Sequence, residues 1–137
     1  VIYCTDCHNN DEAGNQNGIN GPHGSNYAPI LRDRMVFTDG NNESSAIYAL
    51  CYRCHDRDSI LNDDDNFKHD KHIRNEDTSC TTCHDPHGSY NNTHLINFNT
   101  DYVSPNRDGQ LEWVDLGTYS GACYLKCHGE DHHPEDY

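Results

Sequence analysis

Eight cysteines form four pairs, and a histidine directly follows the second cysteine of every pair. The first three pairs read C-x-x-C-H, and the fourth has one residue more, C-x-x-x-C-H. This pattern is the attachment signature of haem c, in which two thiols bond one porphyrin and the histidine supplies the proximal nitrogen to iron. The cysteine pairs are Cys4 and Cys7, Cys51 and Cys54, Cys80 and Cys83, and Cys123 and Cys127, and the proximal histidines are His8, His55, His84 and His128.

The spacing of each pair suits this chemistry. Cysteines three or four residues apart lie on one face of a helix, so a single helical turn presents both sulfurs to one macrocycle. Zinc ribbons and disulfides are the alternative uses of paired cysteines. Neither of them requires a histidine after the second cysteine of every pair. We therefore predict four haem c groups, each with its iron, as the cofactors.

The remaining histidines are candidates for the second axial position on each iron. Four haems need eight axial ligands, and the proximal histidines fill four of them. Seven histidines remain for four places: His23, His69, His72, His87, His94, His132 and His133. Met35 is the only methionine, so at most one haem has histidine and methionine as its axial ligands. Two strong axial ligands leave iron no open position, which predicts an electron carrier and not an enzyme.

The composition indicates a chain that depends on its cofactors to fold. Only 33% of the residues are hydrophobic and 23% are charged, which is too little apolar surface for an ordinary core. The porphyrins must therefore form the core, and the haem-free chain is expected to be unfolded. A net charge of −14 without any basic run argues against binding to nucleic acid or to an anionic membrane surface. No stretch approaches the roughly 20 apolar residues of a membrane span.

The chain pattern predicts a single tetrahaem cytochrome domain over residues 1–137, mostly irregular, with short α-helices at the haem motifs and a few short β-strands. Residues 9–21 and 38–43 are rich in Asn, Asp and Gly and are expected to be loops. We expect helices over residues 44–55, with Ser44 as N-cap, and over residues 120–128, with Gly129 as the C-terminal stop. Alternating residues predict strands over 95–99 and 111–116, with a turn over 104–109 between them.

Two short segments resemble parts of known multihaem cytochromes. The segment Phe67–His72 is similar to the F-x-H-x-x-H segment of small multihaem cytochromes, in which both histidines are distal ligands of different haems. Pro-His-Gly-Ser occurs at residues 22–25 and 86–89 and resembles the doubled-motif multihaem families, in which this histidine is a distal ligand. The first choices for distal ligands are therefore His23, His69, His72 and His87. His132 and His94 are the second choices, and His133 is the spare.

The whole order of motifs resembles the extracellular tetrahaem cytochromes that polymerise into conductive filaments, the OmcE-like nanowire group. The order is CxxCH, PHGS, CxxCH, HxxH, CxxCH-DPHGS, HLINF and a final GxCYLxCHGxxHxP. The resemblance implies a secreted homopolymer on the cell surface in which a histidine of one subunit ligates a haem of its neighbour. His23 is the candidate for that role. The chain departs from the family pattern at His133 and in its Asp- and Asn-rich loops.

Other readings of the same motifs remain open. A monomeric tetrahaem shuttle in the periplasm or on the cell surface would need the same four haems. A multihaem redox enzyme would need at least one five-coordinate iron. For the filament and for the shuttle, the partners are redox proteins or extracellular electron acceptors. Cys4 lies so close to the start that we expect the chain to begin near a cleaved export signal.

Overall fold

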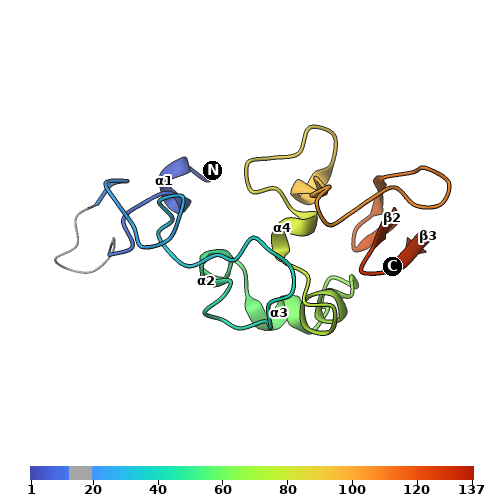
Figure 1. The fold of residues 1–137 in the computed structure, drawn as a ribbon, viewed down its shortest axis with the longest axis horizontal. Helices are drawn as coiled ribbons and strands as arrows, with labels where there is room; N and C mark the ends of the chain where they lie inside the picture. Colours follow the sequence, from blue (N-terminus) through green and yellow to red (C-terminus); the bar gives the residue numbers. More distant parts are fainter. Residues whose placement is uncertain (13–19) are drawn as a thin grey trace. The chain divides into compact units, whose positions relative to one another are not determined.

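The computed structural model describes residues 1–12 and 20–137, most of which have no regular secondary structure (Figure 1). The regular elements are short: α1 (Cys4–Cys7), α2 (Ala49–Tyr52), α3 (Arg57–Leu61), the π-helical turn η1 (Lys71–Asn75), α4 (Cys80–Cys83), the 3-10 turn η2 (Thr93–Leu95), and strands β1 (Glu112–Gly117), β2 (Ser120–Cys127) and β3 (Glu130–Asp136). This confirms the predicted fold class. Among the described residues, no helix has the length and apolar character needed to cross a bilayer.

Two compact units divide the chain. Unit 1 contains the described residues of Val1–Val36 together with Glu43–Arg57, and unit 2 contains Phe37–Asn42 together with Asp58–Tyr137. The first and second cysteine motifs belong to unit 1, and the third and fourth belong to unit 2. A single tetrahaem domain over residues 1–137 stays a prediction. Of the predicted loop at 9–21, residues 13–19 lie outside the described part of the chain.

One helical turn forms at each of the first three motifs, as the spacing predicts. Helices α1 and α4 coincide with the C-x-x-C segments, and α2 ends inside the second motif. In all three, the backbone N–H of the histidine donates to the carbonyl of the first cysteine: His8 to Cys4 at 2.7 Å, His55 to Cys51 at 3.1 Å and His84 to Cys80 at 2.9 Å. The i to i−4 bond is the closing bond of an α-helical turn. The turn therefore holds the two sulfurs and the histidine together.

The helix predicted over residues 44–55 is shorter in the structure. Ser44 acts as expected at its start, because its Oγ accepts a hydrogen bond from the backbone N–H of Ile47 at 3.2 Å. Only Ala49–Tyr52 is α-helical, however, and turns precede and follow it. Helix nucleation is unfavourable, and most of the stability of a helix comes from packing of one face against the rest of the protein. Without such packing along residues 44–55, only one turn remains helical.

A three-stranded antiparallel sheet with the order β1-β2-β3 lies in unit 2. Strand β1 confirms the strand predicted over residues 111–116, displaced by one residue. The predicted turn at 104–109 is also present, and the N–H of Gly109 donates to the carbonyl of Asn106 at 2.9 Å. This turn leads into β1.

The helix predicted over residues 120–128 is wrong, because this segment is strand β2. Strands pair with it on both sides, Trp113 opposite Cys123 and Leu125 opposite His132. Two hydrogen-bonded ladders outweigh one isolated helical turn, whose nucleation is unfavourable. His128 (φ 38°) and Gly129 (φ 88°) form the two-residue connection to β3. Positive φ at both positions is the requirement of a type I′ hairpin, so Gly129 turns a hairpin and does not stop a helix.

The strand predicted over residues 95–99 is also wrong. His94 and Leu95 have φ values of 55° and 58°, which interrupt an extended chain. Only Ile96 forms a β-bridge, and its partner is His84 in the third motif. The segment is therefore a support for that motif.

Few apolar side chains are buried in the described residues. They are Leu31, Met35, Tyr48, Leu61, Ile73, Ile96, Val103, Trp113, Ala122 and Leu125. They are dispersed along a chain of 137 residues. This sparse packing agrees with the expectation that most of the core comes from the cofactors.

A buried ion pair stabilises the chain beside the second motif. The Glu43 side chain is 3% exposed and accepts hydrogen bonds from Arg57 Nε at 2.8 Å and Nη2 at 2.6 Å. Arg57→Met would leave a buried carboxylate without its cation, and we expect a loss of about 3 kcal/mol in the free energy of unfolding. Denaturant unfolding of the haem-loaded protein measures this loss.

The matched control is Arg53→Met. Arg53 pairs with Asp33 at 2.9 Å, but both side chains are about one-third exposed or more. An exposed pair contributes at most about 1 kcal/mol. Equal losses in the two variants would contradict a special role for the buried pair.

Candidate functional site

The histidine of the first motif is fixed by a neighbouring segment of unit 1. His8 Nδ1–H donates to the carbonyl of Pro29 at 3.1 Å. The residues before and after His8 also form backbone hydrogen bonds with this segment. Asn9 N–H donates to the Ile30 carbonyl at 3.1 Å, and Arg32 N–H donates to the Cys7 carbonyl at 2.9 Å. Residues 29–32 therefore run antiparallel to the end of the motif.

The third motif repeats this arrangement in unit 2. His84 Nδ1–H donates to the carbonyl of His94 at 2.7 Å. Asp85 N–H bonds the Leu95 carbonyl at 2.9 Å, and Asn97 N–H bonds the Cys83 carbonyl at 3.0 Å. These bonds occupy the same relative positions as those of the first motif.

Two further features identify the arrangement as an internal repeat. In each copy the serine of Pro-His-Gly-Ser donates its hydroxyl to the supporting segment, Ser25 to the Leu31 carbonyl and Ser89 to the Ile96 carbonyl. Ile30 and Leu95, at matching places, both have positive φ. Sequence reasoning noted the repeated Pro-His-Gly-Ser but missed these supporting segments. Their signal is the apolar pair that follows each repeat.

The repeat has a direct chemical consequence. An imidazole that donates Nδ1–H to a carbonyl is fixed in one tautomer, and its Nε2 is left with a lone pair for a metal. Metal-ligating histidines nearly always have such a partner. This arrangement suits His8 and His84 to their predicted role as proximal ligands.

The second motif is more exposed at its cysteines and histidine than the other three, and its thiols lie near those of the first motif. Cys54 and His55 are exposed, and Cys51 is half-buried with its Sγ 3.5 Å from Met35 Sδ. Burial raises the pKa of Cys7, and the nearby Cys54 adds to the effect. The thiols of the first and second motifs are therefore neighbours in unit 1.

The third and fourth motifs are neighbours in unit 2. Burial raises the pKa of Cys83 to about 12, with Cys127 and then Cys123 as further causes. Burial also raises the pKa of Cys123 and of Cys127 to about 11. The raised pKa values therefore reflect a group of buried, neighbouring thiols in unit 2.

The fourth motif departs from the geometry of the others because it lies on β2. Four residues of strand span about 13 Å, whereas one helical turn brings two cysteines much closer. Both side chains still face one side of the strand, since their separation is even. Bonding one macrocycle to both Cys123 and Cys127 requires this segment to shorten.

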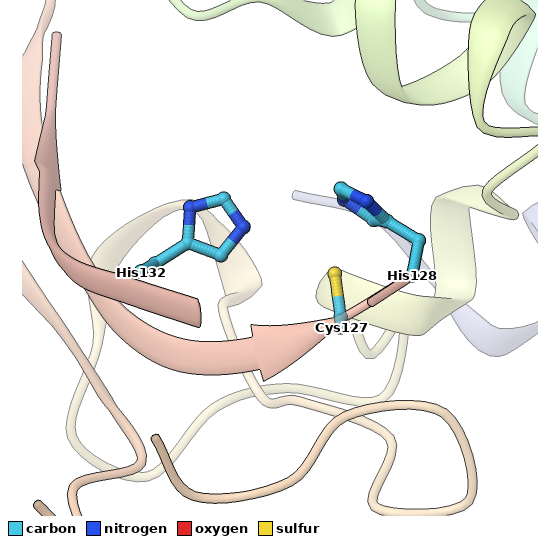
Figure 2. Close-up of side chains that lie close together, drawn as sticks. All are labelled: Cys127, His128 and His132. Atoms are coloured by element: carbon cyan, nitrogen blue, oxygen red, sulfur yellow. The ribbon is translucent and has the colours of Figure 1, made fainter. Parts of the chain in front are cut away.

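Around the fourth motif the structure gathers imidazoles. Cys127, His128 and His132 have ligand atoms within 4.8 Å of one another, and Figure 2 shows the His132 ring to the left of the Cys127 sulfur and the His128 ring above it. Both ring nitrogens of His128 and Nε2 of His132 are buried without a hydrogen-bond partner among the described residues. Glu76 Oε2 is 3.6 Å from His128 Nδ1, which is too long for a hydrogen bond. Buried polar atoms without partners indicate a missing ligand.

Two of the predicted distal ligands approach these motifs from the turn before the third motif. The His69 ring centroid lies 6.4 Å from that of His84, and the His72 centroid lies 5.7 Å from that of His128. Phe67 contacts both, with centroid distances of 4.7 Å to His69 and 4.8 Å to His72. Burial lowers the pKa of His72, so its ring is neutral at pH 7 and able to bind a metal.

Four of the other candidate histidines lie on the surface of the described chain. His23, His87, His94 and His133 are exposed. His94 presents its carbonyl to His84, while its ring packs edge-on against Trp113 at 5.9 Å. His133 Nδ1 lies 2.6 Å from Asp108 Oδ2, and His87 Nδ1 lies 3.5 Å from Asp85 Oδ1. Their roles as ligands stay predictions.

These arrangements fit a covalently bound haem. The oriented imidazoles would supply axial nitrogens and the paired cysteines the thioether bonds. An aromatic-lined hollow beside the third motif includes Phe37, His84, His87 and Phe98. A bound haem would supply a redox-active iron, and the hydrogen bonds of His8 and His84 would orient its axial ligands.

Comparison with known proteins gives one match. A family model described as the doubled CXXCH motif matches residues 3–60 and 71–103. These ranges include the first three motifs, and the fourth lies beyond them. No curated protein and no solved structure matches the chain.

Proposed function

The chain belongs to the doubled CXXCH motif family, whose paired motifs indicate a multihaem c-type cytochrome, and on this basis we propose that it carries four haem c groups and transfers electrons between them. Each iron has two histidine ligands in this proposal, so no open position remains for a substrate. The function is electron transport and not catalysis of a bond-making step.

One observation carries the proposal. The first and third motifs each form a helical turn, and in each the histidine Nδ1 bonds a backbone carbonyl of the supporting segment. In this tautomer Nε2 is the nitrogen that can bind iron. A disulfide pair has no need for a histidine held in this way, and a histidine directly after the second cysteine of every pair favours haem over zinc. The fourth haem is supported by the buried, unpartnered imidazole of His128.

The count of ligands in unit 1 bears on assembly. Two haems need four axial ligands, but His8, His23 and His55 are the histidines that this unit's sequence contains. The fourth ligand is either Met35, which contacts Cys51, or a histidine from outside the unit. We favour a histidine from outside the unit. An exchange of one histidine between identical subunits of a homopolymer leaves this count unchanged, because each unit 1 receives one ligand for the one that it gives. His23, which is exposed, is our choice for the ligand given to a neighbouring subunit.

We further propose that this homopolymer is an extracellular filament which conducts electrons to redox proteins or to extracellular acceptors. The charge of −14 suits a hydrophilic surface in water. A periplasmic or surface shuttle with the same haems is the alternative.

Negative-stain electron microscopy of the haem-loaded protein separates these two assemblies. We expect filaments from the parent protein, isolated particles from His23→Ala, and filaments from the control His133→Ala. Isolated globular particles of the parent protein at every concentration would favour the shuttle and leave electron transfer by four haems unaffected.

A further inference from the structure

Pairs of imidazoles in unit 2 have the separation that a shared iron requires. A nitrogen bound to a metal lies about 2 Å from it, and the ring centre lies about 1 Å further, so two imidazoles on opposite sides of one metal have centroids about 6 Å apart. His69 and His84 are 6.4 Å apart, and His72 and His128 are 5.7 Å apart. From this geometry we infer that His69 is the distal ligand of the third haem and His72 that of the fourth.

The ring nitrogen that would not bind iron has a hydrogen-bond partner in three of these four histidines. His84 Nδ1–H and His72 Nδ1–H each donate to a backbone carbonyl at 2.7 Å, those of His94 and Lys68. His69 Nδ1–H donates to Asp65 Oδ1 at 3.3 Å. Each ring therefore keeps Nε2 for iron.

His132 is the competing ligand for the fourth haem. Its centroid lies 5.9 Å from that of His128, which also fits a shared metal. No hydrogen bond fixes the His132 ring among the described residues, and its Nε2 is buried without a partner. His72, in contrast, is held by the Lys68 carbonyl and stacks on Phe67 with the planes 19° apart. The better-oriented ring is the one we assign to iron.

In this pairing, the distal ligands of the third and fourth haems come from the same short segment of the chain. His69 and His72 are three residues apart, and they extend to irons that belong to different motifs. Phe67 lies against both rings and orients them together. The third and fourth haems are thus adjacent and fully ligated within unit 2.

The angles between the rings give each haem a distinct spectroscopic signature. The planes of His69 and His84 are 20° apart, and those of His72 and His128 are 71° apart. Near-parallel imidazoles act on the same iron d orbital and split the dxz and dyz levels, which gives a rhombic low-spin signal in electron paramagnetic resonance. Near-perpendicular imidazoles leave these levels almost equal, which gives a highly anisotropic signal.

The inference rests on the proposed function, and the test uses the haem-loaded protein. His69→Met should remove one rhombic signal, and His72→Met should remove one highly anisotropic signal. In each variant one haem should shift to a higher reduction potential, since methionine replaces histidine on iron. The control is His133→Met, because among the described residues the His133 ring contacts Asp108 and neither of the two imidazole pairs. This variant should change neither signal.

His132→Met decides between the two ligands of the fourth haem. Loss of the highly anisotropic signal in this variant, with His72→Met unchanged, would overturn the assignment. Should a methionine variant fail to accumulate, His72→Ala is expected to show a high-spin iron that returns to low spin with added imidazole. Absence of that high-spin iron would also overturn it. A parent protein with fewer than four haems would instead contradict the proposed function.

Discussion

A chain that has acquired no haem will be unfolded. The described residues bury few apolar side chains, and the motif turns are single helical turns that cannot persist alone. Without porphyrin, the imidazoles of His128 and His132 would also stay buried with no partner. We expect a far-UV circular dichroism spectrum of disordered chain and no cooperative thermal transition. The loss of stability is therefore complete.

The control is the same chain matured with haem, measured at equal concentration. A variant with serine at all eight cysteine positions provides the haem-free chain without a change in length. A cooperative unfolding transition in this variant would show that the polypeptide forms its own core.

Removing the cysteines of the fourth motif will remove one haem of the four. Cys123→Ser with Cys127→Ser leaves no thiol for attachment, although His128 stays in place. We expect the haem content, from the pyridine haemochrome absorbance per polypeptide, to fall to about three-quarters of the parent value. This variant tests the motif whose strand geometry differs from that of the others.

Cys80→Ser with Cys83→Ser is the matched variant in a motif with the helical turn. It should lose the same fraction of haem. If only this variant loses haem and the fourth-motif variant keeps the parent content, the C-x-x-x-C-H segment is not an attachment site and the protein carries three haems.

The sequence was sufficient for features that depend on neighbours in the chain. The C-x-x-C spacing predicted the turns at Cys4–Cys7 and Cys80–Cys83, because a turn of helix needs only a local hydrogen bond. The strand near residues 111–116 followed from alternation, and the turn before it from the segment 104–109. These elements have few competing conformations.

Features that depend on distant partners were not accessible. The Cys123–Cys127 spacing suits a helix by itself, and only the pairing of Ser120–Cys127 with two other strands makes it extended. Likewise, nothing near His84 in the sequence indicates that the carbonyl of His94 holds its ring. That contact exists because Ile96 forms a bridge with His84, ten or more residues away.

The distal ligands illustrate the same division. Counting histidines gave seven candidates for four positions, and resemblance placed His69 and His72 among the first. The choice of iron for each required the ring distances to His84 and His128, which arise from tertiary packing. For the exposed His23, no ring contact among the described residues assigns it to an iron.

The intact mass of the purified, denatured protein shows how many haems are covalently bound to the chain. We expect a polypeptide heavier by four haems, which stay attached after extraction with acidified organic solvent because thioether bonds hold them. A mass with fewer than four haems, or loss of the haem on extraction, would contradict it.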